Sequence, residues 1–142
     1  MKIDSNFIFQ LTLLTNALLV LLIIMTQKIN YPLFLYVRSE DFNQYHNFYT
    51  NAVTKIVLPL MAIEMVSNLF LLLINYNNIY FFSQIIIFLI WLSTFFIQVP
   101  LHNKINKNYD ELLVKKLIKS NWIRTSLWFL KFCLLFYFYR GF

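Results

Sequence analysis

Glycine is nearly absent from this chain of 142 residues, and proline, cysteine and charged side chains are scarce. The sequence has one glycine, three prolines and one cysteine, and only 13% of its residues are Asp, Glu, Lys or Arg. A β-sandwich or β-barrel needs many turn residues, so this composition argues against both. Phosphate-binding loops and hydrolase nucleophile elbows also need glycine, which occurs only at Gly141. Cys133 has no second cysteine with which to form a disulfide.

Apolar sequence, in contrast, is abundant. Hydrophobic residues make up 60% of the chain and aromatic residues 20%, whereas a soluble domain is about half apolar and about a quarter charged. Four apolar segments, at approximately 7–26, 53–75, 79–99 and 122–139, are each long enough to cross a hydrocarbon core ~30 Å thick. We therefore predict an all-α, integral membrane four-helix bundle that forms a single transmembrane domain over residues 1–142.

Two further helical features are predicted outside the hydrocarbon core. The helix of the second span should begin near residue 42, which makes it longer than the core, and Pro59 should kink it. Between the third and fourth spans, residues 110–119 begin with acidic side chains and then set leucine and isoleucine against lysines. This pattern predicts a short amphipathic helix on the membrane surface.

The cations are distributed unequally between the two ends of the predicted bundle. One end carries Lys28, Arg38, Lys55, Lys104, Lys107, Lys115, Lys116, Lys119 and Arg124, whereas Lys2, Lys131 and Arg140 are assigned to the remainder. Lys and Arg are enriched on the cytoplasmic side of membrane proteins. We therefore expect loops 26–53 and 100–122 in the cytoplasm and both termini outside it. The Asn-, Ile- and Lys-rich usage suggests a bacterial protein, which places it in the cytoplasmic (inner) membrane.

The net charge of +6 has a second interpretation, which is nucleic-acid binding. The cations lie beside apolar segments, however, so membrane topology explains them better than a basic groove does. The expected partners are therefore the lipid bilayer and, in an accessory role, another membrane protein subunit, and no nucleic acid is expected.

Ionisable residues inside the predicted spans are costly and indicate a specific role. Glu64 should lie near the middle of the second span, and Lys131 at a comparable depth in the fourth. With Asn16 and Asn68 they are predicted to form an intramembrane polar cluster. This cluster is interpreted either as architectural or as a proton-handling, catalytic carboxylate tuned by Lys131.

A second group of polar and aromatic residues is predicted at the basic end. Helical spacing aligns residues of the third and fourth helices, and the predicted ligand-binding set is Trp91, Gln98, His102, Asn103, Asn121, Arg124 and Trp128. The candidates for catalysis are Glu64, His46, His102 and Arg124. Interfacial polar packing, with Arg124 meeting a lipid phosphate, is the alternative.

A haem or metal held by His46 and His102 is a further alternative, since histidines from two helices can ligate either. No HxxxH, ExxH or HxxE motif supports it. The sequence therefore disfavours both groups and assigns no cofactor and no metal site.

The segments VPLHNKI and SNWIRTSLW, with an Asp-containing helix between them, resemble small bacterial four-helix membrane proteins similar to the anthrone-oxygenase-like family. The resemblance covers about the C-terminal third of the chain. It implies a four-helix bundle with polar residues at the ends of the third and fourth helices, at His102, Asn103, Asn121, Trp122, Arg124, Thr125 and Trp128. An oxygenase activity does not follow from family similarity alone.

Two functions remain open from the sequence. The leading one is a small membrane protein that acts as an accessory or interaction subunit, or that binds an apolar ligand in the bundle interior. The alternative is a membrane oxidoreductase or oxygenase-like enzyme for a quinone-like or aromatic substrate. In that enzyme Glu64, His46 and His102 would be acid–base or ligand residues, and Arg124 and Asn121 would orient the substrate. A transporter is disfavoured because four helices leave little room for alternating access.

Overall fold

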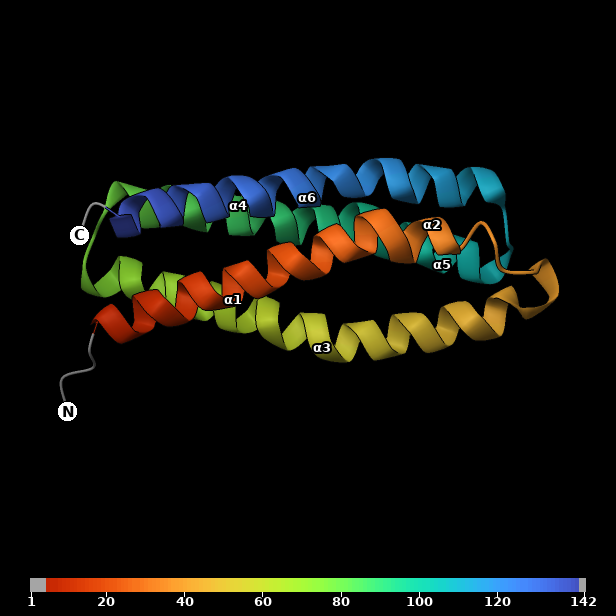
Figure 1. Cartoon of the computed structure of the whole chain (residues 1–142), viewed down its shortest axis with the longest axis horizontal. Helices are drawn as coiled ribbons and strands as arrows, with labels where there is room; N and C mark the ends of the chain where they lie inside the picture. Colours follow the sequence, from red (N-terminus) through yellow and green to blue (C-terminus); the bar gives the residue numbers. More distant parts are fainter. Residues whose placement is uncertain (1–4, 141–142) are drawn as a thin grey trace.

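A computed structural model describes residues 5–140, except the side chain of Arg140, and shows a bundle of four long helical segments (Figure 1). The elements are α1 (Ser5–Met25), the π-helical turn η1 (Thr26–Asn30), α2 (Tyr31–Leu33), α3 (Ser39–Ile74), α4 (Asn78–Ser93), the π-helical turn η2 (Thr94–Gln98), α5 (Val99–Lys107) and α6 (Glu111–Arg140). The described part of the chain has no strand, so the predicted all-α bundle is confirmed.

The four helical segments run alternately in opposite directions, and no long connection joins one to the next. The start of α1, the end of α6 and the connection from α3 to α4 lie at one end of the bundle, and the α2–α3 and α5–α6 connections lie at the other (Figure 1). The second end is the basic one, and we refer to it below as the basic end. This arrangement agrees with the order of spans that the sequence predicts.

The bundle exposes a largely apolar surface and buries many polar side chains among its hydrophobic core residues. Large hydrophobic side chains such as Leu21, Phe88 and Leu73 are exposed, while Asn16, Glu64 and other polar side chains are buried. An exposed apolar surface of this extent would be a liability in water but suits contact with lipid. Three segments, Ser5–Leu33, Ser39–Ile74 and Asn78–Lys107, are long and apolar enough to cross a membrane. These features are those of a small membrane protein.

Two of the helical segments continue past the ends that the sequence predicts. The first was expected to end near residue 26 and the third at residue 99, yet they reach Leu33 and Lys107. In both places a π-helical turn precedes a proline, and the backbone N–H of the residue before that proline donates to the carbonyl five residues back. The wider turn accommodates Pro32 and Pro100, each of which lacks a backbone donor. The prolines therefore do not end the helices.

The predicted short amphipathic helix between the third and fourth spans is wrong as a separate element. Its residues form the first turns of α6, which runs without a break for 30 residues. The amphipathic pattern is real, because Val114 and Leu117 are buried while the neighbouring lysines are exposed. Most of the predicted loops 26–53 and 100–122 is likewise helical, and only residues 34–38 and 108–110 lie outside helices.

The long second helix is confirmed, since α3 spans 36 residues and contains Pro59. Figure 1 shows α3 changing direction near its middle, so that its first half diverges from α1. Because Pro59 removes one helical hydrogen bond and crowds the preceding turn, it is the physical cause of such a bend.

The turn between α3 and α4 depends on one side chain. Asn77 precedes α4, and its Oδ1 accepts a hydrogen bond from the backbone N–H of Ile79 at 2.8 Å. We predict that Asn77→Ala lowers the free energy of unfolding by ~1 kcal/mol, because a helix donor loses its cap. Unfolding in mixed micelles measures this loss. Asn77→Asp keeps the acceptor oxygen and should retain the stability; an equal loss in both variants would contradict the capping role.

Candidate functional site

The intramembrane carboxylate has three donors around it. Asn16 of α1 donates to Glu64 Oε1 at 2.9 Å, Lys131 of α6 donates to the same oxygen at 2.9 Å, and the indole N–H of Trp128 donates to Oε2 at 3.1 Å. Glu64 and Lys131 are almost inaccessible, so this is a buried ion pair. We call Asn16, Glu64, Trp128 and Lys131 the Glu64 cluster.

Asn68 does not join the Glu64 cluster, although the sequence placed it there. Its amide donates to the backbone carbonyl of Tyr80 at 3.1 Å and to Gln84 Oε1 at 2.8 Å. One helical turn separates Asn68 from Glu64, but the rotation of α3 directs Asn68 toward α4 instead of toward α1 and α6. Asn68 therefore joins α3 to α4.

Trp128 connects the Glu64 cluster to a second buried cation. The guanidinium of Arg124 lies over the Trp128 ring, 5.1 Å from its centroid, and donates to Asn121 Oδ1 at 3.4 Å. The ion pairs of the described residues are Lys131–Glu64 and Lys115–Glu111, so Arg124 has no acidic partner there. Arg124 Nε also has no hydrogen-bond partner. Arg124 is thus a buried cation for which residues 5–140 supply no counter-ion.

Arg124 lines a cavity of about 350 Å³ between α1, α3, α6 and the segment formed by η2 and α5. We call this space the Arg124 cavity. Most of its wall is apolar, contributed by side chains such as Leu19, Val53 and Met61. Its polar wall groups gather toward the basic end and include Thr26, Tyr31, Thr50, Gln98, His102, Asn103 and Arg124. The cavity therefore has a long apolar body and one polar, cationic end.

The two π-helical turns help to build the polar end. Thr26 belongs to η1, and Thr94 and Gln98 belong to η2; all three line the cavity. Gln98 is buried, and its Oε1 has no hydrogen-bond partner among the described residues. An unpaired acceptor at Gln98 and an unpaired donor at Arg124 thus share one cavity wall. Such π-helical turns are frequent at functional sites because they change the direction of side chains.

A chain of hydrogen bonds leads from the cavity toward the surface of the basic end. The Tyr31 hydroxyl and His102 Nε2 are 3.0 Å apart, His102 Nδ1 and His46 Nε2 are 2.9 Å apart, and His46 Nδ1 and Asn106 Oδ1 are 3.4 Å apart. Asn106 in turn donates to Asn47 Oδ1 at 2.8 Å. Arg124 faces the Tyr31 hydroxyl at the inner end. We call Tyr31, His102, His46 and Asn106 the Tyr31–Asn106 chain.

Aromatic packing holds the histidines of this chain in place. The His46 ring stacks on Phe42 with centroids 5.4 Å apart and on His102 with centroids 5.1 Å apart, while Phe34 meets His46 edge-on at 5.3 Å. Phe34 and Phe42 are fully buried in the hydrophobic core at the basic end.

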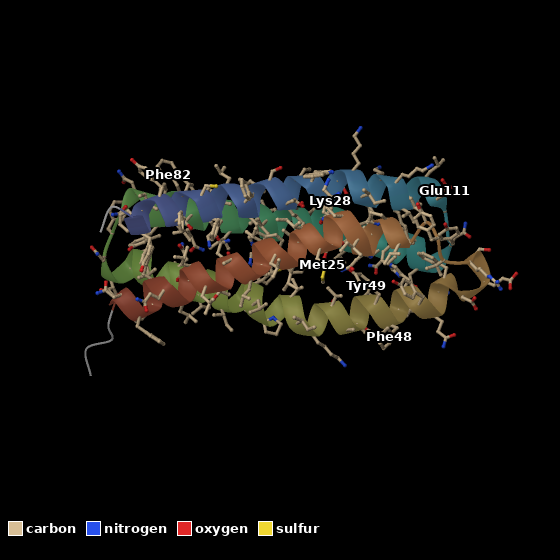
Figure 2. All side chains as sticks on the ribbon, in the orientation of Figure 1. Met25, Lys28, Phe48, Tyr49, Phe82 and Glu111 are labelled. Carbon is tan, nitrogen blue, oxygen red and sulfur yellow. The ribbon has the colours of Figure 1, made fainter. Side chains whose placement is uncertain are left out.

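Figure 2 shows Tyr49 pointing from α3 into the bundle while its neighbour Phe48 points away from it.

The remaining predicted residues divide between the cavity and its surroundings. Gln98, His102, Asn103, Arg124 and Trp128 line the cavity, whereas Trp91 and Asn121 are not part of its lining. Trp91 packs against Phe95, with ring centroids 5.4 Å apart. Asn121 and Thr125 both donate to Gln27 Oε1, at 3.0 and 3.4 Å, so they join α6 to η1. Trp122 is exposed and lies under Lys28.

Sequence reasoning did not identify Tyr31, Gln27 or Tyr49 as site residues. Tyr31 was expected in the loop at residues 26–53, because the first span was expected to end near residue 26. The π-helical turn instead carries the helix onward and buries Tyr31 against His102. The repeated pattern of a threonine six residues before a proline, Thr26 with Pro32 and Thr94 with Pro100, is the sequence signal that marks both turns.

A metal or haem held between His46 and His102 does not fit this geometry. Their facing ring nitrogens are 2.9 Å apart, which is a hydrogen-bond distance and leaves no room for an ion between two nitrogen ligands that each need about 2.0 Å. Within residues 5–140, no group of three His, Cys, Asp or Glu side chains is arranged to hold a metal ion.

Comparisons with protein-family models, with curated proteins and with solved structures found no match to this chain, so the function has to be argued from the site itself.

Proposed function

We propose that this chain is a small integral membrane protein that binds an amphiphilic molecule in the Arg124 cavity, with the oxygen-bearing head of the molecule at Arg124. The observation that supports it most is the charge of Arg124. A buried cation inside a membrane bundle is costly without a partner, and none of the described residues supplies an acid. An anionic or electron-rich ligand head would supply the missing counter-charge.

The shape of the cavity supports the same proposal. A volume of about 350 Å³ with a mostly apolar wall is within the range of small-molecule sites. Arg124 and Gln98 place a donor and an acceptor at one end, and the apolar wall accepts a hydrocarbon or aromatic body. These polar groups line a pocket between the helices that opens beside exposed lining residues such as Leu58 and Phe95, so a ligand can enter, and ligand binding is favoured over a purely accessory role.

The fluorescence of Trp128 tests the proposal, because Trp128 lines the cavity. In a variant that carries Trp91→Phe and Trp122→Phe, Trp128 is the one tryptophan that remains. We predict that dibromostearic acid quenches Trp128 saturably, since bromine in the cavity would contact the indole. The methyl ester of the same acid should bind at least ~10-fold more weakly, because it offers Arg124 no charge.

Val53 and Ile56 provide matched controls on α3. Val53 lines the cavity, whereas Ile56 is exposed on the outer face. Val53→Phe should fill the space and reduce saturable quenching, while Ile56→Phe should leave it unchanged. Equal, non-saturating quenching by acid and ester in all variants would mean that the probe reaches Trp128 only through the bilayer, and the proposal would be wrong.

A membrane oxidoreductase or oxygenase-like enzyme is the second candidate. It is favoured by His102 and Tyr31, which place an acid–base pair in the cavity wall. Positions suggested by the resemblance to anthrone-oxygenase-like proteins, including His102, Asn103 and Trp128, line the same cavity. Turnover of a hydroquinone or phenol by the purified protein would favour this candidate over simple binding.

We also propose that α6 crosses the bilayer as the fourth span, and that the basic end faces the cytoplasm of a bacterium. Exposed Lys104, Lys107 and Lys115 at that end support this orientation. In a Cys133→Ser background, Asn77→Cys should react with an impermeant maleimide added to intact cells, and Asn108→Cys only after permeabilisation. The reverse labelling pattern would invert the topology.

A further inference from the structure

The Tyr31–Asn106 chain joins the inside of the cavity to the aqueous surface without a break. Tyr31 and His102 line the cavity, and His46 is almost completely buried behind them. Asn106 is half-buried and hydrogen-bonds to exposed Asn47. Each link joins two groups that can donate or accept a proton, except the terminal amide, which marks where the chain meets water.

The hydrogen bonds of this chain have one consistent direction. The side-chain N–H of Asn106 donates to Asn47, so the Asn106 oxygen faces His46. Because that oxygen can only accept, His46 Nδ1 must carry the proton. In a neutral ring His46 Nε2 is then an acceptor, so His102 Nδ1 donates to it. His102 Nε2 becomes an acceptor in the same way, and the Tyr31 hydroxyl donates to it. The Tyr31 oxygen also accepts a hydrogen bond from Arg124 at the cavity end, and one further acceptor position remains on it for a ligand.

From this arrangement we infer that the Tyr31–Asn106 chain is a proton path between the ligand head and the surface of the basic end, and that the ligand is a weak oxygen acid with a phenol, hydroquinone or carboxyl head. This inference rests on the proposed binding of an amphiphile in the Arg124 cavity. It adds the chemical class of the ligand head and a route for its proton.

The proton balance of the path is simple. The ligand O–H gives its proton to the Tyr31 oxygen while the Tyr31 proton moves to His102 Nε2. The Nδ1 proton of His102 moves to His46 Nε2, and the Nδ1 proton of His46 leaves to water beside Asn106. One proton enters, one leaves, and no group is oxidised or reduced. The bound ligand becomes an anion beside Arg124. When the ligand is protonated again, the reverse transfers return each proton of the Tyr31–Asn106 chain to its original nitrogen or oxygen.

The groups around the cavity suit a weak acid better than a neutral head. Arg124 favours the ionised form of a nearby acid, because an opposite charge stabilises it. The unpaired acceptor of Gln98 suits a ligand hydroxyl before ionisation. Other titratable groups near the histidines are phenols, with Tyr45 and Tyr49 on α3 against Phe34 and Tyr109 against Phe42. No carboxylate of the described residues pairs with either histidine.

The test uses a hydroxycoumarin with a heptyl chain, a phenol whose absorbance changes on ionisation. The protein is held in nanodiscs in weak buffer with a pH indicator, and rapid mixing follows both signals. For the unmodified protein we expect the probe to ionise as it binds, with about one proton released per bound probe. Tyr31→Phe keeps the ring but removes the hydroxyl. It should slow ionisation and proton release at least ~10-fold, while the equilibrium affinity changes by less than about threefold.

Two variants separate the proton path from general damage to the cavity. His46→Phe preserves the aromatic stack and lies outside the cavity lining, so it should also slow proton release without weakening binding. Tyr36→Phe removes a hydroxyl from an exposed tyrosine at the same end of the bundle, outside both the cavity lining and the Tyr31–Asn106 chain, and should behave like the unmodified protein. Release that stays as fast in Tyr31→Phe and His46→Phe would overturn the proton path alone. Absence of Arg124-dependent binding would overturn the proposed function and the path together.

Discussion

Lys131→Met is expected to destabilise the folded protein by about 3–5 kcal/mol, because it leaves the Glu64 carboxylate buried without its counter-ion. Lys131 is fully buried and its ammonium lies 2.9 Å from Glu64 Oε1. Asn16 and Trp128 would remain as donors, but neither carries a charge. Unfolding of the purified protein in mixed micelles, followed by helical circular dichroism, measures the change.

A double-mutant cycle isolates the contribution of the pair. Glu64→Gln alone leaves Lys131 as the unpaired charge and should destabilise by a similar amount, while its remaining carbonyl oxygen still accepts from one neighbour. The combination of Glu64→Gln with Lys131→Met removes both charges and should recover at least about half of the summed loss. Strictly additive losses would show that the two residues do not stabilise the fold as a pair.

An exposed ion pair on the same helix provides the control. Lys115 and Glu111 form a salt bridge on α6, but their side chains are 57% and 59% exposed. Water already solvates both charges, so Lys115→Met should leave the unfolding transition unchanged. If Lys115→Met destabilised as strongly as Lys131→Met, loss of charge from α6 in general would explain both results, and the burial of Glu64 would not.

The sequence predicts the fold well because long apolar segments, and charged residues within them, can be located directly in the sequence. Four long helices follow from four apolar segments, and the approach of Lys131 to Glu64 follows from two charges at comparable depth on α3 and α6, which both run away from the basic end. The predicted ends of the first and third spans, near residues 26 and 99, are wrong for a local reason, because both helices continue through a proline, Pro32 or Pro100. Whether a proline ends a helix depends on whether the preceding turn can widen, and no residue type alone determines that.

The candidate site was predictable only in part for the same reason. His46 and His102 lie 56 residues apart in sequence, and the sequence placed them at the same surface without showing that they hydrogen-bond. Tyr31 could not be joined to them while its helix was expected to stop. Asn68 is the opposite case, in which a predicted contact is not made. It lies one helical turn from Glu64, yet its side chain hydrogen-bonds to α4 instead. Side-chain direction depends on packing that sequence spacing does not contain.

The two buried cations of α6 therefore have opposite roles, although they lie seven residues apart. Lys131 is paired with a carboxylate of the protein, so its charge is neutralised when the chain folds. Arg124 has no such partner among the described residues, where it meets the Trp128 ring, the Asn121 amide oxygen and the Tyr31 hydroxyl, none of which carries a negative charge. A residue of the first kind stabilises the fold, whereas under the proposed function one of the second kind is retained for binding at a cost in stability.

Arg124→Met should consequently change stability and binding in opposite directions. Removal of the unpaired charge should raise the unfolding free energy of the ligand-free protein by about 1–2 kcal/mol, since the cost of burying the charge exceeds its contact with the Trp128 ring. The affinity for dibromostearic acid should fall at least ~100-fold, because the charged hydrogen bonds to the head are lost. Unfolding in mixed micelles and Trp128 quenching measure the two effects.

Lys119→Met is the matched control, because Lys119 is an exposed cation on the same helix. It should change neither the stability nor the affinity. A large loss of stability in Arg124→Met would instead place Arg124 among the residues that hold the bundle together, as Lys131 does. In that event the unpaired guanidinium would not be a ligand site, and the apolar cavity beside it would have to be explained without a charged ligand head.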